Sequence, residues 1–136
     1  MPYLRDYHIM ISHSWDYSKQ FETISGWLDG TPYFRWTDYS VPITRPLSFS
    51  GVTDLKQKIR ARISLCSCVI ILSGMYVAYS DWIDFEIDTA AALGKPIIGV
   101  RPWGQERIPA KVQDNAVAMV GWNSDSIVDA VRRYAL

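Results

Sequence analysis

At 136 residues and 49% apolar content, the chain is expected to form one domain over residues 1–136 with its own core. Its 14 basic and 14 acidic residues balance, so electrostatics favours neither nucleic acid nor an anionic membrane as a partner. The two cysteines and two histidines lack metal-ligand spacing, and no membrane span or signal peptide is evident, so we expect a cytoplasmic protein without a metal.

Five short runs of residues are predicted to be β-strands. Four of them are apolar, rich in β-branched residues, too short for a typical helix and bounded by Gly, Ser, Pro or Asn. Their near-continuous apolarity indicates parallel strands covered on both faces. The remaining run, 33–37, mixes apolar and polar residues as an edge strand does. In chain order the runs are 7–12, 33–37, 66–72, 96–100 and 116–120.

Helical patterns separate these runs. Apolar residues recur at helical spacing over 17–29, over 53–65 and from Ser124 onward, and a short helical turn is expected after Pro109. Basic residues lie off the apolar stripe of 53–65. A solvated helix face explains them better than a partner surface does.

Another helix is predicted to begin at Ser80 or Asp81 as its N-cap and to end at Gly94. Trp82 and Glu86 are four residues apart in it, so their side chains share one helix face. That face is otherwise apolar or small. A carboxylate there is costly unless it meets a cavity or a partner.

The alternation of strands and helices predicts a doubly wound, five-stranded parallel α/β sheet in the order 2-1-3-4-5. Ligands of such sheets bind at the switch point, between the carboxyl ends of strands one and three. The loops that follow these two strands are 13–16 and 73–76, and the helix that carries Glu86 comes directly after the second loop. The loop 38–51 is longer than usual for such a connection, which is typical of a lid or a contact surface.

Several chemistries of this fold class lack their motifs here. No Gly-x-Gly-x-x-Gly follows the first strand, and there is no Walker motif or Gly-x-Ser-x-Gly elbow. Ser73 stands where a phosphoacceptor receiver has an aspartate. His13 and Ser14 are adjacent in sequence, which does not make them a catalytic dyad.

A lone carboxylate, loop hydroxyls and aromatic side chains remain near the predicted crevice. A glutamate with aromatic walls suits reactions at a glycosidic carbon, where it holds ribose hydroxyls or stabilises an oxocarbenium-like transition state. Two simpler interpretations stay open. Glu86 fits an acid in the first turns of a helix, favoured by the helix dipole. Core packing accounts equally for the aromatic residues Trp15, Tyr76, Trp82 and Trp103.

Three motifs in this order resemble a TIR domain and, more narrowly, the TIR-like ThsB proteins of bacterial Thoeris anti-phage systems. The resemblance extends over residues 7–134, nearly the whole chain. The motifs are Ile-Met-Ile-Ser-His-Ser-Trp at 9–15, Val-Ile-Ile-Leu-Ser at 69–73, and Trp82-x-x-x-Glu86 followed by Gly-Lys-Pro-Ile-Ile at 94–98.

The resemblance implies a flavodoxin-like fold and cleavage of NAD+, as substrate rather than cofactor, at the nicotinamide–ribose bond. Glu86 matches the family's catalytic glutamate, and 38–51 matches the loop used in TIR self-association. ThsB-type proteins release a cyclic ADP-ribose isomer, a messenger that activates a separate effector. Together with the switch-point rule, these implications give the residues expected to bind substrate: His13, Ser14, Trp15, Asp38, Ser73, Met75, Tyr76 and Trp82.

Two questions stay open at this point. Many TIR enzymes are fused to sensor or oligomerisation domains, and none is expected here, which implies a domain that is inactive until it is triggered. The alternative function is a TIR-like adaptor that binds partners without turnover. The two differ in whether Glu86 faces a cleft or is neutralised by a neighbouring base.

Overall fold

The computed structural model describes residues 5–12, 18–40, 52–72, 76–101 and 110–136; at 18, 52–55 and 76–82 it describes the backbone alone. Strands and helices alternate along the whole chain, as the sequence predicts. The elements are β1 (Asp6–Ser12), α1 (Ser18–Gly30), β2 (Arg35–Asp38), α2 (Val52–Ser64), β3 (Cys68–Leu72), α3 (Tyr76–Ala92), β4 (Ile97–Val100), α4 (Ala110–Asn115), β5 (Ala118–Val120) and α5 (Ser124–Tyr134).

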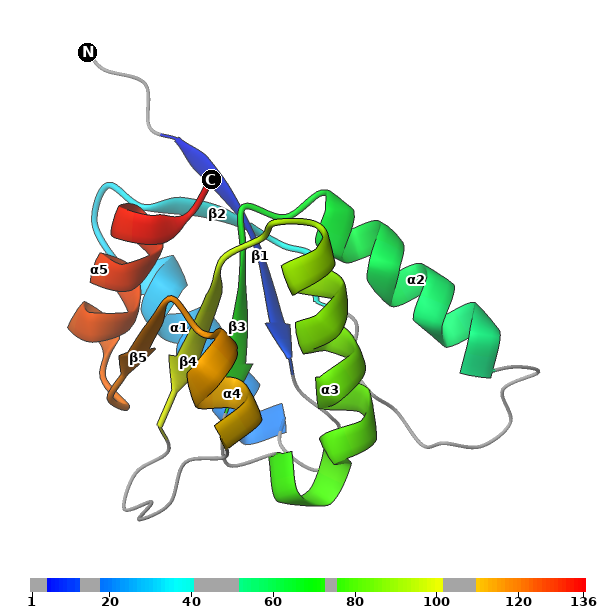
Figure 1. The fold of residues 1–136 in the computed structure, drawn as a ribbon. Helices are drawn as coiled ribbons and strands as arrows, with labels where there is room; N and C mark the ends of the chain where they lie inside the picture. Colours follow the sequence, from blue (N-terminus) through cyan, green and yellow to red (C-terminus); the bar gives the residue numbers. More distant parts are fainter. Residues whose placement is uncertain (1–4, 13–17, 41–51, 73–75, 102–109) are drawn as a thin grey trace.

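The five strands form one parallel sheet in the order β2-β1-β3-β4-β5, which confirms the predicted fold class. Helices α1 and α5 cover one face of the sheet, and α2, α3 and α4 cover the other (Figure 1). Burial on both faces explains why β3 and β4 consist of apolar and small residues alone and are buried throughout. The edge strand β2 carries the half-buried Trp36 and is mostly exposed, as its mixed composition predicts.

The core forms where the helix stripes meet the sheet. Strands β1 and β3 supply fully buried residues, and each of the longer helices adds apolar residues at helical spacing. The two cysteines, Cys66 and Cys68, are buried and form no disulfide. The helix residues with no exposed surface include Ile24 and Leu28 of α1, Ile59 and Ile63 of α2, Ile83 and Ile87 of α3, and Ile127 and Val131 of α5.

One helix boundary was predicted wrongly. Helix α3 begins at Tyr76, four residues before Ser80, so neither Ser80 nor Asp81 is its N-cap. The residues Tyr76 to Tyr79 contain no glycine or proline, so nothing in the sequence stops the helix from extending back through them. The predicted end is confirmed, because Gly94 takes the left-handed conformation (φ 70°) two residues after Ala92, the last helical residue.

Two residues that the helical patterns assign to apolar faces are partly exposed. Leu93 follows the last turn of α3 and is 42% exposed, and Tyr134 ends α5 and is 39% exposed. Both lie where a helix leaves the sheet, so the periodic pattern continues beyond the surface that it packs against. Among the described residues, no helix is long and apolar enough to span a membrane.

Candidate functional site

The carboxyl group of Glu86 lies inside the fold. Helix α3 carries it on the same face as Ile83, Ile87 and Ala90, and all four side chains have no exposed surface. Glu86 is almost three turns from the start of α3, so the interpretation as a first-turn acid is wrong. A helix dipole acts mainly on the terminal turns and does not explain a carboxyl at this depth.

Ser12 is the hydrogen-bond partner of this carboxyl. It is the last residue of β1, has no exposed surface, and its Oγ donates a hydrogen bond to Glu86 Oε1 at 2.6 Å. Ser12 also pairs in register with Ile71 of the neighbouring strand β3. The contact therefore lies at the carboxyl ends of β1 and β3, which is the switch point of the sheet.

The electrostatics of the carboxyl is dominated by its burial. Removal from water penalises the charged form and raises the pKa of Glu86 from 4.5 to about 8, while the hydrogen bond from Ser12 opposes this rise. Glu86 Oε2 is also buried and has no hydrogen-bond partner within the described part of the chain. A buried polar atom without a partner is costly, and such atoms concentrate at functional sites.

The other predicted site residues are described only in part. The edge-strand residue Asp38 is exposed, and its Oδ1 accepts a hydrogen bond from the Ser40 backbone N–H at 2.8 Å. It pairs in register with Ile9, three residues before Ser12, and no described contact joins it to Glu86. Tyr76 and Trp82 lie on α3, but only their backbone is described. The residues His13, Ser14, Trp15, Ser73 and Met75, and the loop from residue 41 to 51, lie outside the described ranges.

The motifs and spacings of the sequence do not mark Ser12 as a site residue. A signal was present, because a small hydroxyl residue ends the apolar run Ile9-Met10-Ile11 exactly where a parallel strand reaches its ligand-binding edge. Among the described residues, no group of His, Cys, Asp or Glu side chains is arranged to hold a metal ion. The two buried thiols are poor nucleophiles, since burial raises the pKa of Cys66 and of Cys68 to about 12.

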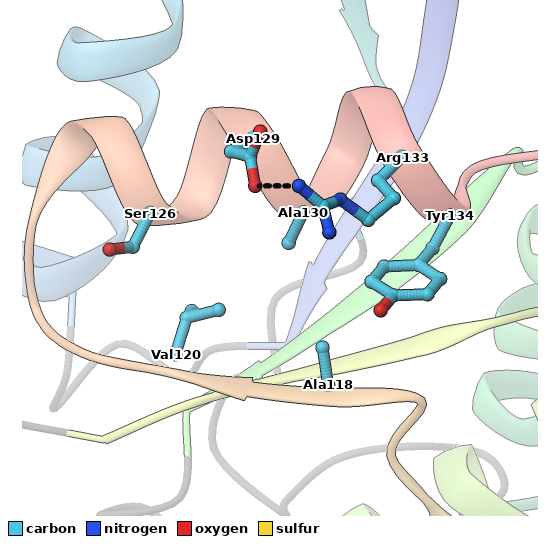
Figure 2. A pocket seen from close by; sticks show the side chains of 7 residues that line it. All are labelled: Ala118, Val120, Ser126, Asp129, Ala130, Arg133 and Tyr134. Carbon is cyan, nitrogen blue, oxygen red and sulfur yellow. Dashed lines mark ion pairs between the residues drawn. The ribbon is translucent and has the colours of Figure 1, made fainter.

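A separate pocket lies between β5 and α5. Its volume is about 210 Å³, below the roughly 300–1,000 Å³ of typical ligand pockets. Figure 2 shows the Asp129–Arg133 ion pair (3.3 Å) at its rim, with Ala118 and Val120 of the edge strand beneath. It belongs to the sheet face covered by α5, whereas α3 carries Glu86 on the other face (Figure 1). This pocket does not include the Glu86 carboxyl.

A five-stranded parallel sheet of this order, covered by helices on both faces, defines the flavodoxin-like class of α/β proteins. Within that class, the family described as Thoeris protein ThsB, TIR-like domain, matches residues 10–107. The chain belongs to this family. The match confirms the resemblance found in the sequence motifs and includes both Ser12 and Glu86.

Two solved structures share the fold at low sequence identity. The CMP N-glycosidase BcmB of Clostridium botulinum superposes with a TM-score of 0.56 and 14% identity, over 92% of this chain and 98% of that one. A 3-dehydroquinate dehydratase-like protein of Bifidobacterium longum gives a TM-score of 0.50 and 9% identity, over 95% and 94%. No curated protein matches the sequence. At these identities the two structures establish the fold alone.

Proposed function

We propose that this protein is a cytoplasmic enzyme that cleaves NAD+ at the nicotinamide–ribose bond, with Glu86 as its catalytic carboxylate. In the proposed role it serves anti-phage defence by releasing a cyclic ADP-ribose isomer that activates a separate effector. NAD+ is the substrate and no cofactor is required. The observation that carries the proposal is the buried Glu86 carboxyl at the switch point, with Oε1 held by Ser12 and Oε2 lacking a described partner.

Cleavage of the nicotinamide–ribose bond is favoured by one negative charge near the ribose. When the bond between ribose C1′ and the nicotinamide nitrogen breaks, its electron pair leaves with nicotinamide and positive charge develops on the ribose. An ionised Glu86 stabilises that charge. The ribosyl carbon then bonds to a nucleophilic atom of the same ADP-ribose, which gives a cyclic product, or to water, which gives ADP-ribose. The attacking water or hydroxyl group releases its proton to solvent.

The burial of Glu86 supports the proposal that the enzyme is inactive before it is triggered. Glu86 has no exposed surface, so substrate reaches it only after a local opening. With its pKa raised to about 8, the carboxyl is mostly neutral near pH 7 and cannot stabilise a cation. Opening admits water or the positively charged nicotinamide ring, and both favour the ionised form. We therefore expect little turnover before the trigger acts.

The fold neighbour from Clostridium botulinum supports this class of reaction. Its name states that it is an N-glycosidase of CMP, a nucleotide whose base–ribose bond resembles the nicotinamide–ribose bond in kind. CMP is therefore a useful second substrate to test. Release of cytosine from CMP, without release of nicotinamide from NAD+, would support the assignment of the catalytic site but identify a different substrate.

A second candidate is an adaptor without turnover, and the complete burial of Glu86 favours it. In that case the carboxyl is a structural group bonded to Ser12. The neutralising base that would mark such a role is not found, because no cationic side chain of the described residues forms an ion pair with Glu86. We therefore place the enzyme first.

One experiment separates the candidates. NAD+ and, separately, CMP are incubated with the protein, with and without extract from infected cells, and the products are identified by mass spectrometry. Nicotinamide and a cyclic ADP-ribose isomer are expected from NAD+ in the activated sample, and neither from the Glu86→Gln variant. If neither nucleotide is cleaved in any sample, the adaptor function is supported instead of the enzyme.

Self-association through the loop 38–51 is a further part of the proposal. The loop contains Val41, Ile43, Leu47 and Phe49, and its length is its supporting observation. Residues 41–51 lie outside the described ranges. Changing Phe49 to Asp is expected to abolish activated turnover while the melting temperature stays near that of the wild type. A fully active Phe49→Asp variant would contradict a role of this loop in self-association.

A further inference from the structure

We propose that Ser12 is a positioning residue for Glu86: its hydroxyl fixes Oε1 and leaves Oε2 as the carboxyl atom that meets the substrate ribose. This inference deepens the proposed function and rests on it for the part that concerns substrate. The part that concerns Glu86 itself is testable without turnover. No sequence motif assigned this role to Ser12.

The geometry gives the two carboxyl oxygens different environments. Oε1 accepts a hydrogen bond of 2.6 Å, which is short for a hydroxyl–carboxyl contact and typical of a strong one. Oε2 is buried and lacks a partner among the described residues. A ribose hydroxyl that reaches the carboxyl therefore finds its unused acceptor on Oε2.

The elements that hold the two residues are packed in the core of the domain. Ser12 ends β1, which lies between β2 and β3 in the sheet, and its neighbour in register is the fully buried Ile71. Glu86 lies well inside α3, flanked by the buried Ile83 and Ile87. A hydrogen bond between a central strand and a packed helix holds the carboxyl with little freedom, as a preorganised catalytic group requires.

Among the described residues, the cations near α3 contact groups other than Glu86. On α2, the cations of Lys56 and Arg60 lie over the ring of Phe85, at 5.3 and 5.8 Å from its centroid. On α4, Lys111 pairs with the exposed Asp88 at 2.7 Å. The half-buried Asp84 lies on α3 itself.

The strands that α3 covers add few ionisable groups. Strand β3 has only Cys68, at its amino end, and β4 has none. The titratable side chains of β1 lie at its start, away from Ser12. Within the described ranges, burial raises the pKa of Glu86 and the hydrogen bond from Ser12 lowers it, so removing the hydroxyl has a defined sign. The charged carboxylate loses a donor, and its pKa rises further.

The direct test is a carbon-13 NMR titration of the glutamate carboxyl groups. The sequence has only three glutamates, Glu22, Glu86 and Glu106, so selective labelling gives three resonances and Glu86→Gln identifies the one of interest. In the wild type, this resonance is expected to titrate near pH 8, because burial raises the pKa of Glu86 to about 8. In Ser12→Ala its midpoint is expected to rise by about one pH unit, the scale of one hydrogen bond to a charged group.

Matched variants separate positioning from general loosening. Ile71→Val removes one methylene from the residue in register with Ser12 and is expected to leave the midpoint unchanged. Ser12→Thr keeps the hydroxyl and is expected to restore the wild-type midpoint. If Ser12→Ala or Ser12→Thr does not fold, Ser12→Cys, with similar size and a weak donor, is expected to give a smaller rise than full removal of the donor.

The outcomes distinguish this inference from the proposed function. A midpoint in Ser12→Ala that stays at or falls below the wild-type value overturns the positioning role, whatever the activity. A raised midpoint in a protein that never cleaves a nucleotide keeps the Ser12–Glu86 contact but removes its catalytic purpose. If the activated wild type turns over NAD+, Ser12→Ala is expected to move the acidic limb of the kcat/KM profile to higher pH.

Discussion

The two ends of the parallel sheet differ in how they accommodate charged side chains. Cations lie at the surface over aromatic rings at the amino end, whereas a carboxyl group is buried at the carboxyl end. At the amino end, Arg5 lies 4.5 Å from the ring centroid of Tyr7, Tyr7 stacks on Phe34 at 5.1 Å, and Arg132 lies 5.5 Å from Phe34. The cations stay at the surface while the rings between them are largely covered. At the carboxyl end, the Glu86 carboxyl is instead buried, and Ser12 is its described partner.

This difference indicates that the amino end of the sheet stabilises the fold, whereas the buried carboxyl group at the carboxyl end destabilises it. Cation–π contacts at a solvated edge cost little desolvation, so the amino end stabilises the domain near its C-terminus (Figure 1). A buried carboxyl with one unpartnered oxygen lowers stability whenever it is ionised. A fold that keeps such a group three turns into a helix is expected to use it in binding or catalysis.

The largest expected effect is on turnover. Glu86→Gln keeps the volume and the helix propensity of the side chain but removes the charge that stabilises an oxocarbenium-like ribose. NAD+ cleavage in an activated preparation should fall roughly 100- to 1,000-fold, as measured by chromatography of the products.

Glu22→Gln is the control for that comparison, since it makes the same chemical change at an exposed position of α1 and should leave the rate unchanged. Thermal denaturation should show both variants folded. Equal rates for wild type and Glu86→Gln would assign the carboxyl end a structural role, like that of the amino end.

The next effect is on the pH dependence of stability. The pKa of Glu86 is about 8 in the folded protein and near 4.5 when the chain is unfolded, so the folded state holds the proton more tightly. Its stabilising contribution is fully present below about pH 4.5 and is lost as the pH rises through about 8. Between these limits the free energy of unfolding should fall by about 1.4 kcal/mol per pH unit relative to Glu86→Gln.

Urea denaturation of the wild type and of Glu86→Gln, in steps from about pH 5 to about pH 8, measures this difference directly. Groups common to both proteins cancel when the two curves are subtracted. A flat difference curve would mean that water already reaches the carboxyl in the folded protein. The contrast between the two ends of the sheet would then disappear.

The sheet was predictable from the sequence because its strands depend on local patterns. Continuous apolar runs identify β1, β3 and β4, and the crossover rules leave few possible orders for five alternating units. The start of α3 was not predictable in the same way. Ser80 and Asp81 have the chemistry of N-caps, and only the backbone of the preceding turn shows that they are not used as caps.

The candidate site was predictable in its position but not in its partner. Topology alone brings the helix with Glu86 to the ends of β1 and β3. The hydrogen bond from Ser12 depends on the register of α3 against the sheet, which joins residues 74 positions apart. The residue pattern within either segment carries no information about a contact between residues so far apart in the chain. Contacts of this kind become visible only when both elements have been placed.

At the amino end, Phe34→Ala should destabilise the domain by about 3 kcal/mol. The ring is 7% exposed, stacks on Tyr7, and truncation of a buried Phe leaves a cavity that the neighbours fill only in part. Urea denaturation measures the loss. The titration midpoint of the Glu86 carboxyl should stay at its wild-type value, because Phe34 lies at the other end of the sheet. A shifted midpoint would show that the two ends are coupled.

The smallest expected effect comes from the surface cation of the same stack. The Arg132 guanidinium lies over Phe34 and donates hydrogen bonds of 3.3 Å to the backbone oxygens of Pro32 and Tyr33, in the turn where Tyr33 has a positive φ of 58°. Because the side chain is exposed, solvent weakens these contacts, and Arg132→Gln should cost only about 0.5–1 kcal/mol.

Arg133→Gln is the matched control for this last prediction. Arg133 is also exposed and pairs with Asp129 one turn earlier on α5, a contact worth about 0.3–0.5 kcal/mol. Urea denaturation of both variants in low and high salt separates the two kinds of contact. Screening should remove most of the Arg133 effect and leave part of the Arg132 effect, since a cation over a ring is partly shielded from ions. Equal losses that vanish together in salt would show that the stack contributes nothing beyond surface charge.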